Sequence, residues 1–158
     1  MVTPMTRGLA IVASLMAGVT LTGCGGDPPI YEIKGQVTLG GKAYPRLLVY
    51  FRPASGEVNR FNMGVGETDQ HGHLVVRSNT GVGLPAGEYT VTFSCQVPRH
   101  NTPASAKLSA DDKPSEVGIT MVELVPDSHL EGKANSTTPV RFTVTSSENV
   151  FIYDIPAK

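Results

Sequence analysis

The residue types best suited to chemistry lie together in one short segment, Asp69 to His73. Asp69, His71 and His73 offer one carboxylate and two imidazoles at alternate positions, and Zn²⁺ accepts both kinds of donor. The same segment, which also contains Gly72, is typical of a solvated β-turn in which the aspartate bonds its own backbone. Because a turn needs nothing beyond these residues, we expect no metal and keep the three side chains as secondary candidate ligands.

Cys95 is the next residue with reactive potential, as a nucleophile or a redox thiol. It falls on the same face of a predicted strand as Tyr89, Val91, Phe93 and Val97, because side chains on a strand alternate between its two faces. A thiol on a buried face behaves as a small apolar side chain. We therefore predict that Cys95 packs in the core.

A hydrolase would need a nucleophile, a base and a group that orients the base. No serine lies in a Gly-x-Ser-x-Gly turn, the arrangement that exposes the nucleophile in many hydrolases. Asp127, Ser128 and His129 are adjacent, and we expect their side chains to diverge along a loop. His100 lies in another polar loop. We predict that the protein is not an enzyme and needs no cofactor.

The chain begins with the features of an export signal. Arg7 is the only charged residue before Asp27, and it precedes an apolar run from Leu9 to Val19. This run is shorter than the roughly 20 residues that span a bilayer, and a basic residue followed by such a run is typical of a secretory signal. We expect residues 1–23 to be removed as a signal peptide.

The signal ends on Leu21-Thr22-Gly23-Cys24, which resembles the bacterial lipobox. The resemblance implies cleavage after Gly23, a diacylglyceryl group on the Cys24 sulfur and a fatty acid such as palmitate on the new amine. Two long acyl chains anchor a protein almost irreversibly, since each buried methylene contributes about 0.8 kcal/mol. Residues 24–29 would form a short tether. Gly25 follows the cysteine, which favours the outer membrane or cell surface over the inner membrane.

Composition limits the remaining classes. The 158 residues carry 13 Lys+Arg and 14 Asp+Glu, a net charge of −1, and no basic patch, which argues against a nucleic-acid partner. The 17 Gly and 12 Pro are typical of short strands joined by turns. We expect one domain over residues 30–158, without a disulfide, because lipidation uses one of the two cysteines.

Alternating apolar and polar residues predict an all-β, antiparallel Greek-key sandwich of seven or eight strands. Gly40-Gly41 predicts a two-residue hairpin turn, and Pro126 to His129 a brief helical turn. Pro98 to Glu116 is predicted to be a surface loop with a short helical turn at Ser109 to Asp112. The predicted strands lie at residues 30–39, 47–52, 61–65, 73–78, 88–97, 117–125, 140–144 and 151–155.

Three motifs in order resemble the carboxypeptidase regulatory-like domain, a prealbumin-like sandwich. They are Gly35-Gln36-Val37-Thr38, Thr68-Asp69-Gln70-His71-Gly72-His73-Leu74 and Leu84-Pro85-Ala86-Gly87-Glu88-Tyr89-Thr90-Val91. Leu74 stands where the family has an aromatic residue. The closing Asn149-Val150-Phe151 resembles the tail of small planctomycete lipoproteins that carry this domain alone. The resemblance implies a non-catalytic fold used for stability, adhesion or carbohydrate contact.

The sequence therefore predicts a lipid-anchored protein of the cell envelope with a non-catalytic structural or protein-binding role. Its expected partners are the membrane, through Cys24, and an envelope protein or glycan. A protein partner could add a strand to an exposed sheet edge or engage the loop from Pro98 to Glu116. The alternative is a carbohydrate- or metal-binding accessory domain. Sugar rings stack on exposed aromatic side chains, but the chain has no Trp, and we expect Tyr44 and Tyr50 to pack in the core or at an edge.

Overall fold

The computed structural model describes residues 26–99, 120–130 and 140–158 of the chain. This part contains ten strands and one 3₁₀ helix and no α-helix, which confirms the all-β prediction. The elements are β1 (Ile33–Leu39), β2 (Leu48–Pro53), β3 (Gly64–Glu67), β4 (His73–Ser78), β5 (Gly81–Val82), β6 (Gly87–Ser94), β7 (Gln96–Pro98), β8 (Met121–Glu123), η2 (Asp127–His129), β9 (Val140–Val144) and β10 (Asn149–Ile155).

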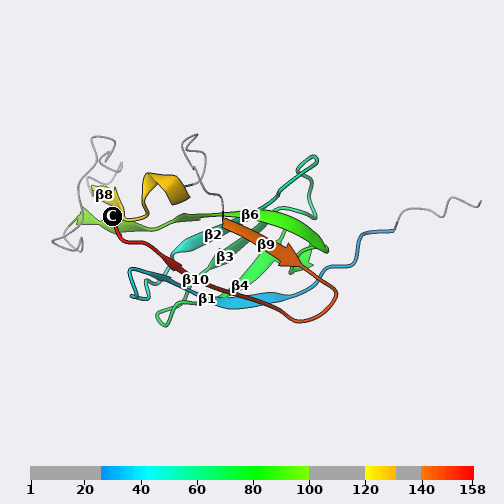
Figure 1. The fold of residues 1–158 in the computed structure, drawn as a ribbon, viewed down its shortest axis with the longest axis horizontal. Coiled ribbons are helices and arrows are strands. Elements are labelled where there is room, and N and C mark those ends of the chain that lie inside the picture. Colours follow the sequence, from blue (N-terminus) through cyan, green and yellow to red (C-terminus); the bar gives the residue numbers. More distant parts are fainter. Residues whose placement is uncertain (1–25, 100–119, 131–139) are drawn as a thin grey trace, which may run out of the picture.

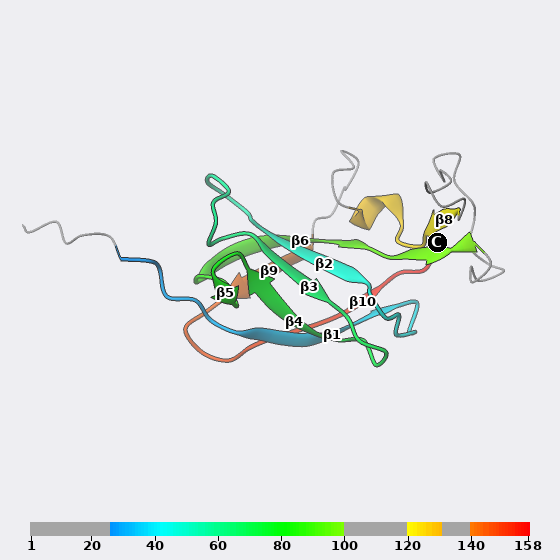
Figure 2. The same ribbon diagram turned by 180° about the vertical axis from the view of Figure 1, so that it is seen from behind.

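Eight of the strands form one sheet in the order β10-β1-β4-β3-β2-β6-β9, with β5 paired to β4, while β7 and β8 form a separate ribbon. The larger sheet curls until it is nearly barrel-shaped (Figures 1 and 2). All its pairs are antiparallel except β1 with β10, which run parallel from Ile33 opposite Asn149 to Leu39 opposite Ile155. This pair departs from the antiparallel prediction because β10 joins the sheet beside β1 and not beside β9, which precedes it in the chain.

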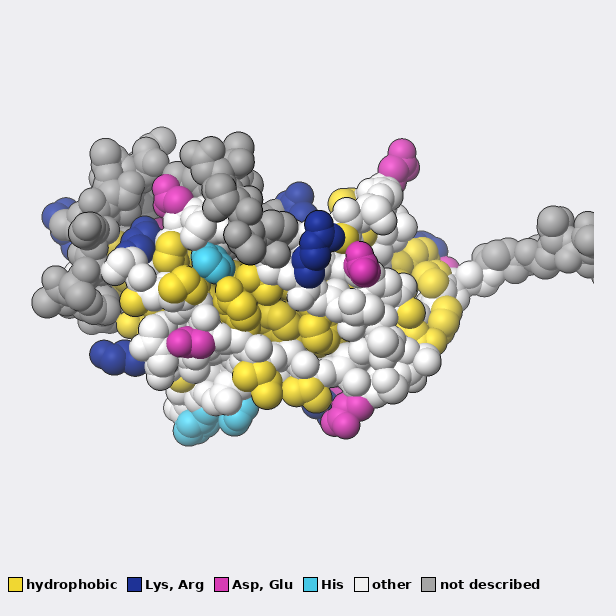
Figure 3. Space-filling model, viewed as in Figure 1, with side chains coloured by type: hydrophobic (Ala, Val, Ile, Leu, Met, Phe, Trp, Pro, Cys, Tyr) yellow, Lys and Arg dark blue, Asp and Glu magenta, His cyan; other side chains and the backbone are white. Residues whose placement is uncertain are grey.

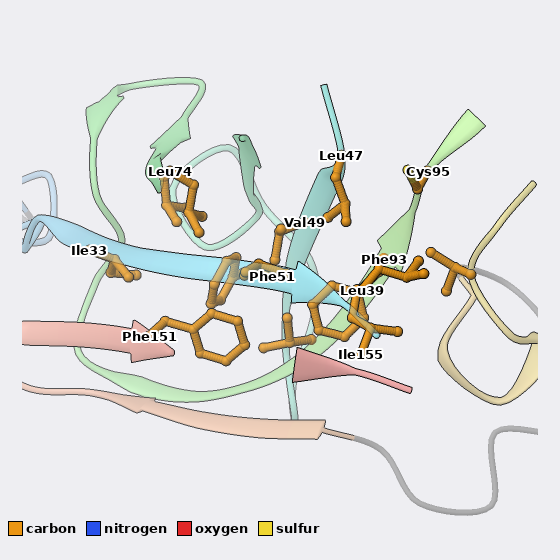
Figure 4. Close-up of a cluster of buried hydrophobic side chains, with 14 of the residues drawn as sticks. Ile33, Leu39, Leu47, Val49, Phe51, Leu74, Phe93, Cys95, Phe151 and Ile155 are labelled. Atoms are coloured by element: carbon orange, nitrogen blue, oxygen red, sulfur yellow. The ribbon is translucent and has the colours of Figure 1, made fainter. Parts of the chain in front are cut away.

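The core lies inside the curled sheet, where the inward faces of the strands meet (Figure 4). Strict alternation along β1, β2 and β6 places every second side chain there, and burying a side chain of this size stabilises the fold by about 1.5–3 kcal/mol. The fully or almost fully buried residues of these three strands are Ile33, Val37, Leu39, Val49, Phe51, Tyr89, Val91 and Phe93.

The third strand is the clearest departure from the predicted boundaries. It was expected over residues 61–65 and lies at Gly64–Glu67, with glycines at its two inward positions. A Cβ on Gly64 would lie 3.0 Å from the Leu84 Cδ atoms, so large side chains of neighbouring elements fill the space that β3 leaves empty. Glycine has no side chain and adds nothing to a pattern of alternating apolar residues. The prediction therefore followed the larger residues before β3 and placed the strand too early.

Other boundaries follow local chemistry. Gly40 and Gly41 have φ of 59° and 74°, which confirms the predicted hairpin turn between paired Leu39 and Lys42. The predicted helical turn is confirmed as η2. The strand predicted over residues 88–97 is broken at Cys95, and β5 was not predicted. Residues 117–119 of another predicted strand, and the turn at Ser109 to Asp112, lie outside the described residues.

Candidate functional site

The turn after β3 uses Asp69 as its anchor. The Asp69 Oδ1 atom accepts hydrogen bonds from the backbone N–H groups of His71 at 2.8 Å and His73 at 2.9 Å, and Gly72 has a φ of 80°. Desolvation would raise the pKa of Asp69, but the two N–H donors and the nearby imidazoles outweigh it, and the pKa is lowered. This carboxylate is already committed to shaping the backbone.

Of the three candidate metal ligands, only the side chains of Asp69 and His73 lie close to each other. The Asp69 Oδ2 and His73 Nδ1 atoms are 3.6 Å apart, while the rings of His71 and His73 are 6.1 Å apart. His71 Nε2 lies 3.2 Å from the side-chain nitrogen of Gln70. Within residues 26–99, 120–130 and 140–158, no three His, Cys, Asp or Glu side chains are grouped closely enough to hold a metal ion.

An open hollow of about 580 Å³ borders this turn on the outer face of β2, β3 and β4. Its lining is partly apolar, with Leu48, Val65, Leu74 and Val75, and partly charged or titratable, with Glu67, Asp69, His73 and Arg77. Of the two carboxylates in this lining, that of Asp69 is already bonded to backbone N–H groups of its own turn. Tyr50, also on the outer face of β2, is half-buried, and Tyr44 packs against the core.

Other residues of the recognisable motifs also act on the backbone. The Thr68 hydroxyl donates to the carbonyl of Tyr44 at 2.6 Å and accepts from the N–H of Leu47 at 3.0 Å. The Tyr89 hydroxyl donates to the carbonyl of Pro85, four residues upstream, at 2.9 Å. The threonine and tyrosine of the motifs thus fix the turns before β2 and β6, which is a structural function.

Cys95 is 1% exposed, and the prediction that it packs in the core is confirmed. Burial, with a smaller contribution from the charge of Glu123, raises the pKa of Cys95 to about 12, so its reactive thiolate form is scarce at neutral pH. The Glu123 carboxylate accepts the N–H groups of Cys95 at 2.8 Å and Val125 at 2.9 Å and the Ser94 hydroxyl at 2.7 Å. It thereby bridges the break between β6 and β7.

One polar group was not predicted from the sequence. Ser128 Oγ lies 2.8 Å from His129 Nδ1, and His129 Nε2 lies 3.0 Å from the Tyr153 hydroxyl. The expectation that the side chains of this triplet diverge is wrong for Ser128 and His129, because η2 folds the hydroxyl back onto the imidazole. No local pattern could have indicated Tyr153, which is 24 residues away and on another strand.

The chemistry of this group is limited by what faces the imidazole. A serine beside a histidine is one part of a hydrolytic arrangement, but the second nitrogen of His129 faces a phenol and not a carboxylate. Burial lowers the pKa of His129 and, together with the charge of Asp154, raises the pKa of Tyr153. The serine, histidine and tyrosine side chains are therefore all neutral at pH 7. Their hydrogen bonds lie beside an aromatic stack in which the rings of Phe93 and Tyr153 are 5.3 Å apart.

The two edges of the large sheet face each other across a seam, defined here as the space between β9 and β10. These strands follow one another in the chain and run antiparallel, yet they do not pair. Buried Asn149 replaces the missing backbone pair: its Oδ1 accepts from the N–H of Thr145 at 2.8 Å and its Nδ2 donates to the Thr145 carbonyl at 3.1 Å. Phe142 and Phe151 touch edge to face at 5.3 Å. Figure 3 shows an apolar band along this seam.

The residues predicted to be lipidated and cleaved, Leu21, Thr22, Gly23 and Cys24, lie outside the described residues. The tether is described from residue 26, and residues 26–29 form no strand. Asp27 pairs with Arg60 at 3.2 Å. No helix in the described part of the chain is long and apolar enough to cross a membrane.

Fold and geometry together define a small all-β domain in which side chains of two of the three recognisable motifs shape turns. Comparison with protein-family models, with curated proteins and with solved structures finds no match to this chain.

Proposed function

We propose that this protein is a lipid-anchored component of the bacterial cell envelope with a non-catalytic, structural or protein-binding role. The observation that carries the proposal is the sequence Leu21-Thr22-Gly23-Cys24 directly after an apolar run that begins behind Arg7. Of the two thiols in the chain, Cys95 is buried with a pKa of about 12. A reaction that requires an accessible thiol therefore falls to Cys24.

The distance from the anchor to the fold supports a position close to the membrane. Only residues 25–32 separate Cys24 from β1, and eight extended residues reach at most about 28 Å. In the proposed arrangement the barrel-shaped domain stands at the lipid surface, on the outer membrane or cell surface, and presents its sides to other envelope components.

The domain itself is proposed to be a carboxypeptidase regulatory-like module. In two of the three motifs that carry this resemblance, the side chains of Thr68, Asp69 and Tyr89 bond the backbone of turns. The first motif lies within β1. Side chains used in this way support a scaffold role for the module. A non-catalytic module at a membrane acts through its surface, and the most direct protein contact for a sheet is its unpaired edge.

The test is the intact mass of the full chain after expression in a bacterial host and extraction of the membranes with detergent. We expect a chain that starts at residue 24 and carries a diacylglyceryl group. The Cys24→Ala variant should remain unprocessed, while Cys95→Ala should be processed normally and serves as the matched control. A soluble, unmodified chain, or equal processing of the Cys24→Ala variant, would contradict the proposed anchor.

A further inference from the structure

We propose that the free edge of β10 binds an extended segment of a partner protein. Along one face of that segment the side chains are, in order, basic, apolar, apolar and basic. This inference rests on the protein-binding part of the proposed function and specifies its partner. The segment would lie beside β10 in the seam and pair with it through backbone hydrogen bonds, as an added strand does.

The first observation is that β10 is paired on one side only. Its seven residues bond β1, while β9 bonds β6, and the described strands leave the seam between them unpaired. At the start of the hairpin the Asn149 side chain takes the place of a backbone pair by bonding both the N–H and the carbonyl of Thr145. Figure 1 shows β9 and β10 lying apart beyond their turn. Beyond Asn149, the backbone of β10 has no strand partner on this side among the described residues.

The outward side chains of the two edge strands differ. On β9 they are Arg141 and Thr143, both exposed and polar, and charged residues on an edge discourage unwanted pairing. On β10 they are Val150, 50% exposed, and Ile152, 74% exposed. An edge with exposed apolar residues favours contact with another strand, so the asymmetry selects β10 as the binding edge.

Charge identifies the partner more closely. Glu148 and Asp154 continue the alternation of Val150 and Ile152 at either end, and both are exposed. The Asp154 Oδ1 accepts hydrogen bonds from the Thr38 hydroxyl at 2.6 Å and the Gly41 N–H at 2.9 Å. These bonds lower its pKa, so Asp154 stays negative. The outer row is acidic, apolar, apolar, acidic, and its complement is basic, apolar, apolar, basic.

The same row disfavours a second copy of this chain as the occupant. Two β10 strands paired antiparallel about Phe151 would bring Val150 opposite Ile152, which is favourable. They would also place Glu148 opposite Asp154 at both ends, and like charges directly opposite each other destabilise a strand pair. A partner with basic ends keeps the apolar contacts and turns both repulsive pairs into attractive ones.

The test uses the detergent-extracted full chain and a fluorescent peptide, Lys-Thr-Val-Thr-Ile-Thr-Lys, with binding followed by fluorescence anisotropy. We expect saturable binding that Ile152→Thr weakens roughly fivefold, because one good cross-strand pair is worth about that factor. Val75→Thr is the matched control: Val75 is also an exposed valine, 39%, but it lies on β4, which is paired with both β1 and β3. This variant should bind as the parent does.

A second peptide with glutamate in place of both lysines separates charge from apolar contact. It should bind more weakly, and added salt should reduce the difference in affinity between the two peptides. The proposal is overturned by absence of saturable binding to the basic peptide, by equal losses for Ile152→Thr and Val75→Thr, by equal affinity for the two peptides, or by dimerisation through β10 without peptide. None of these outcomes alters the mass of lipidated Cys24, so the anchor is judged separately.

Discussion

The wall of the barrel and its seam are closed by different interactions. From β1 through β4, β3 and β2 to β6, each strand bonds the backbone of the next, and the pattern continues whatever the outward side chains are. Between β9 and β10, closure depends on side chains, namely the Asn149 amide and the Phe142–Phe151 contact. Beside the seam, the link from His129 to Tyr153 joins η2 to β10. Many equivalent backbone hydrogen bonds stabilise the wall. The seam depends on a few side chains, and single substitutions can remove each of them.

The strongest way to break both regions at once is Phe51→Ala. Phe51 is fully buried on β2, and its ring contacts Phe142 at 6.0 Å and Phe151 at 5.4 Å, so it joins the wall to the seam. We expect the free energy of unfolding to fall by about 4 kcal/mol in urea titrations, because the substitution removes apolar contacts and leaves a cavity. Phe51→Leu should cost less than half as much. A loss below about 1 kcal/mol for the alanine variant would show that the two regions are independent.

The next largest effect is expected where β10 joins the wall. A Cβ on Gly35 would collide with the backbone carbonyl of Phe151, and backbone cannot move aside as a side chain can. Gly35→Ala should therefore lower the free energy of unfolding by about 3 kcal/mol, at the upper end of overpacking costs. Gly26→Ala, where nothing lies within 4 Å, is the control and should leave the urea midpoint unchanged. Equal midpoints for both variants would contradict the close approach of β1 and β10.

Asn149→Ala tests the seam alone. It removes a buried amide and leaves the N–H and carbonyl of Thr145 without their partner, which we expect to cost about 2 kcal/mol of unfolding free energy. Asn149→Asp should cost less, since its Oδ1 still accepts from the Thr145 N–H. Asn79→Ala, at an exposed turn, is the neutral control. If Asn149→Ala were as stable as the parent, the amide would not be needed to close the seam.

The same division explains what the sequence could predict. The wall repeats a period of two, and the positions of β1, β2, β4 and β6 follow from it to within a few residues. The hairpin at Gly40-Gly41 and the turn at Asp69 follow from local chemistry. The parallel pairing of β1 with β10, the role of Asn149 and the meeting of His129 with Tyr153 depend on residues far apart in the chain. Such contacts leave no local pattern. The weakest strand in sequence, β3, is the one whose inward residues are glycines.

The smallest expected effect is a pH dependence where η2 meets β10. Burial lowers the pKa of His129 in the folded chain, whereas an unfolded histidine has a pKa of about 6.5. Between these two values the unfolded chain binds more protons, so stability rises with pH there. The contribution of His129 is therefore complete above about pH 6.5, declines as the pH falls toward the lowered folded value, and declines no further below it. His129→Gln should remove this component when urea midpoints at about pH 7.5 and about pH 5 are compared, while the exposed His71→Gln should keep it. An identical pH response in the parent and the His129→Gln variant would show that protonation of this imidazole does not strain the link to Tyr153.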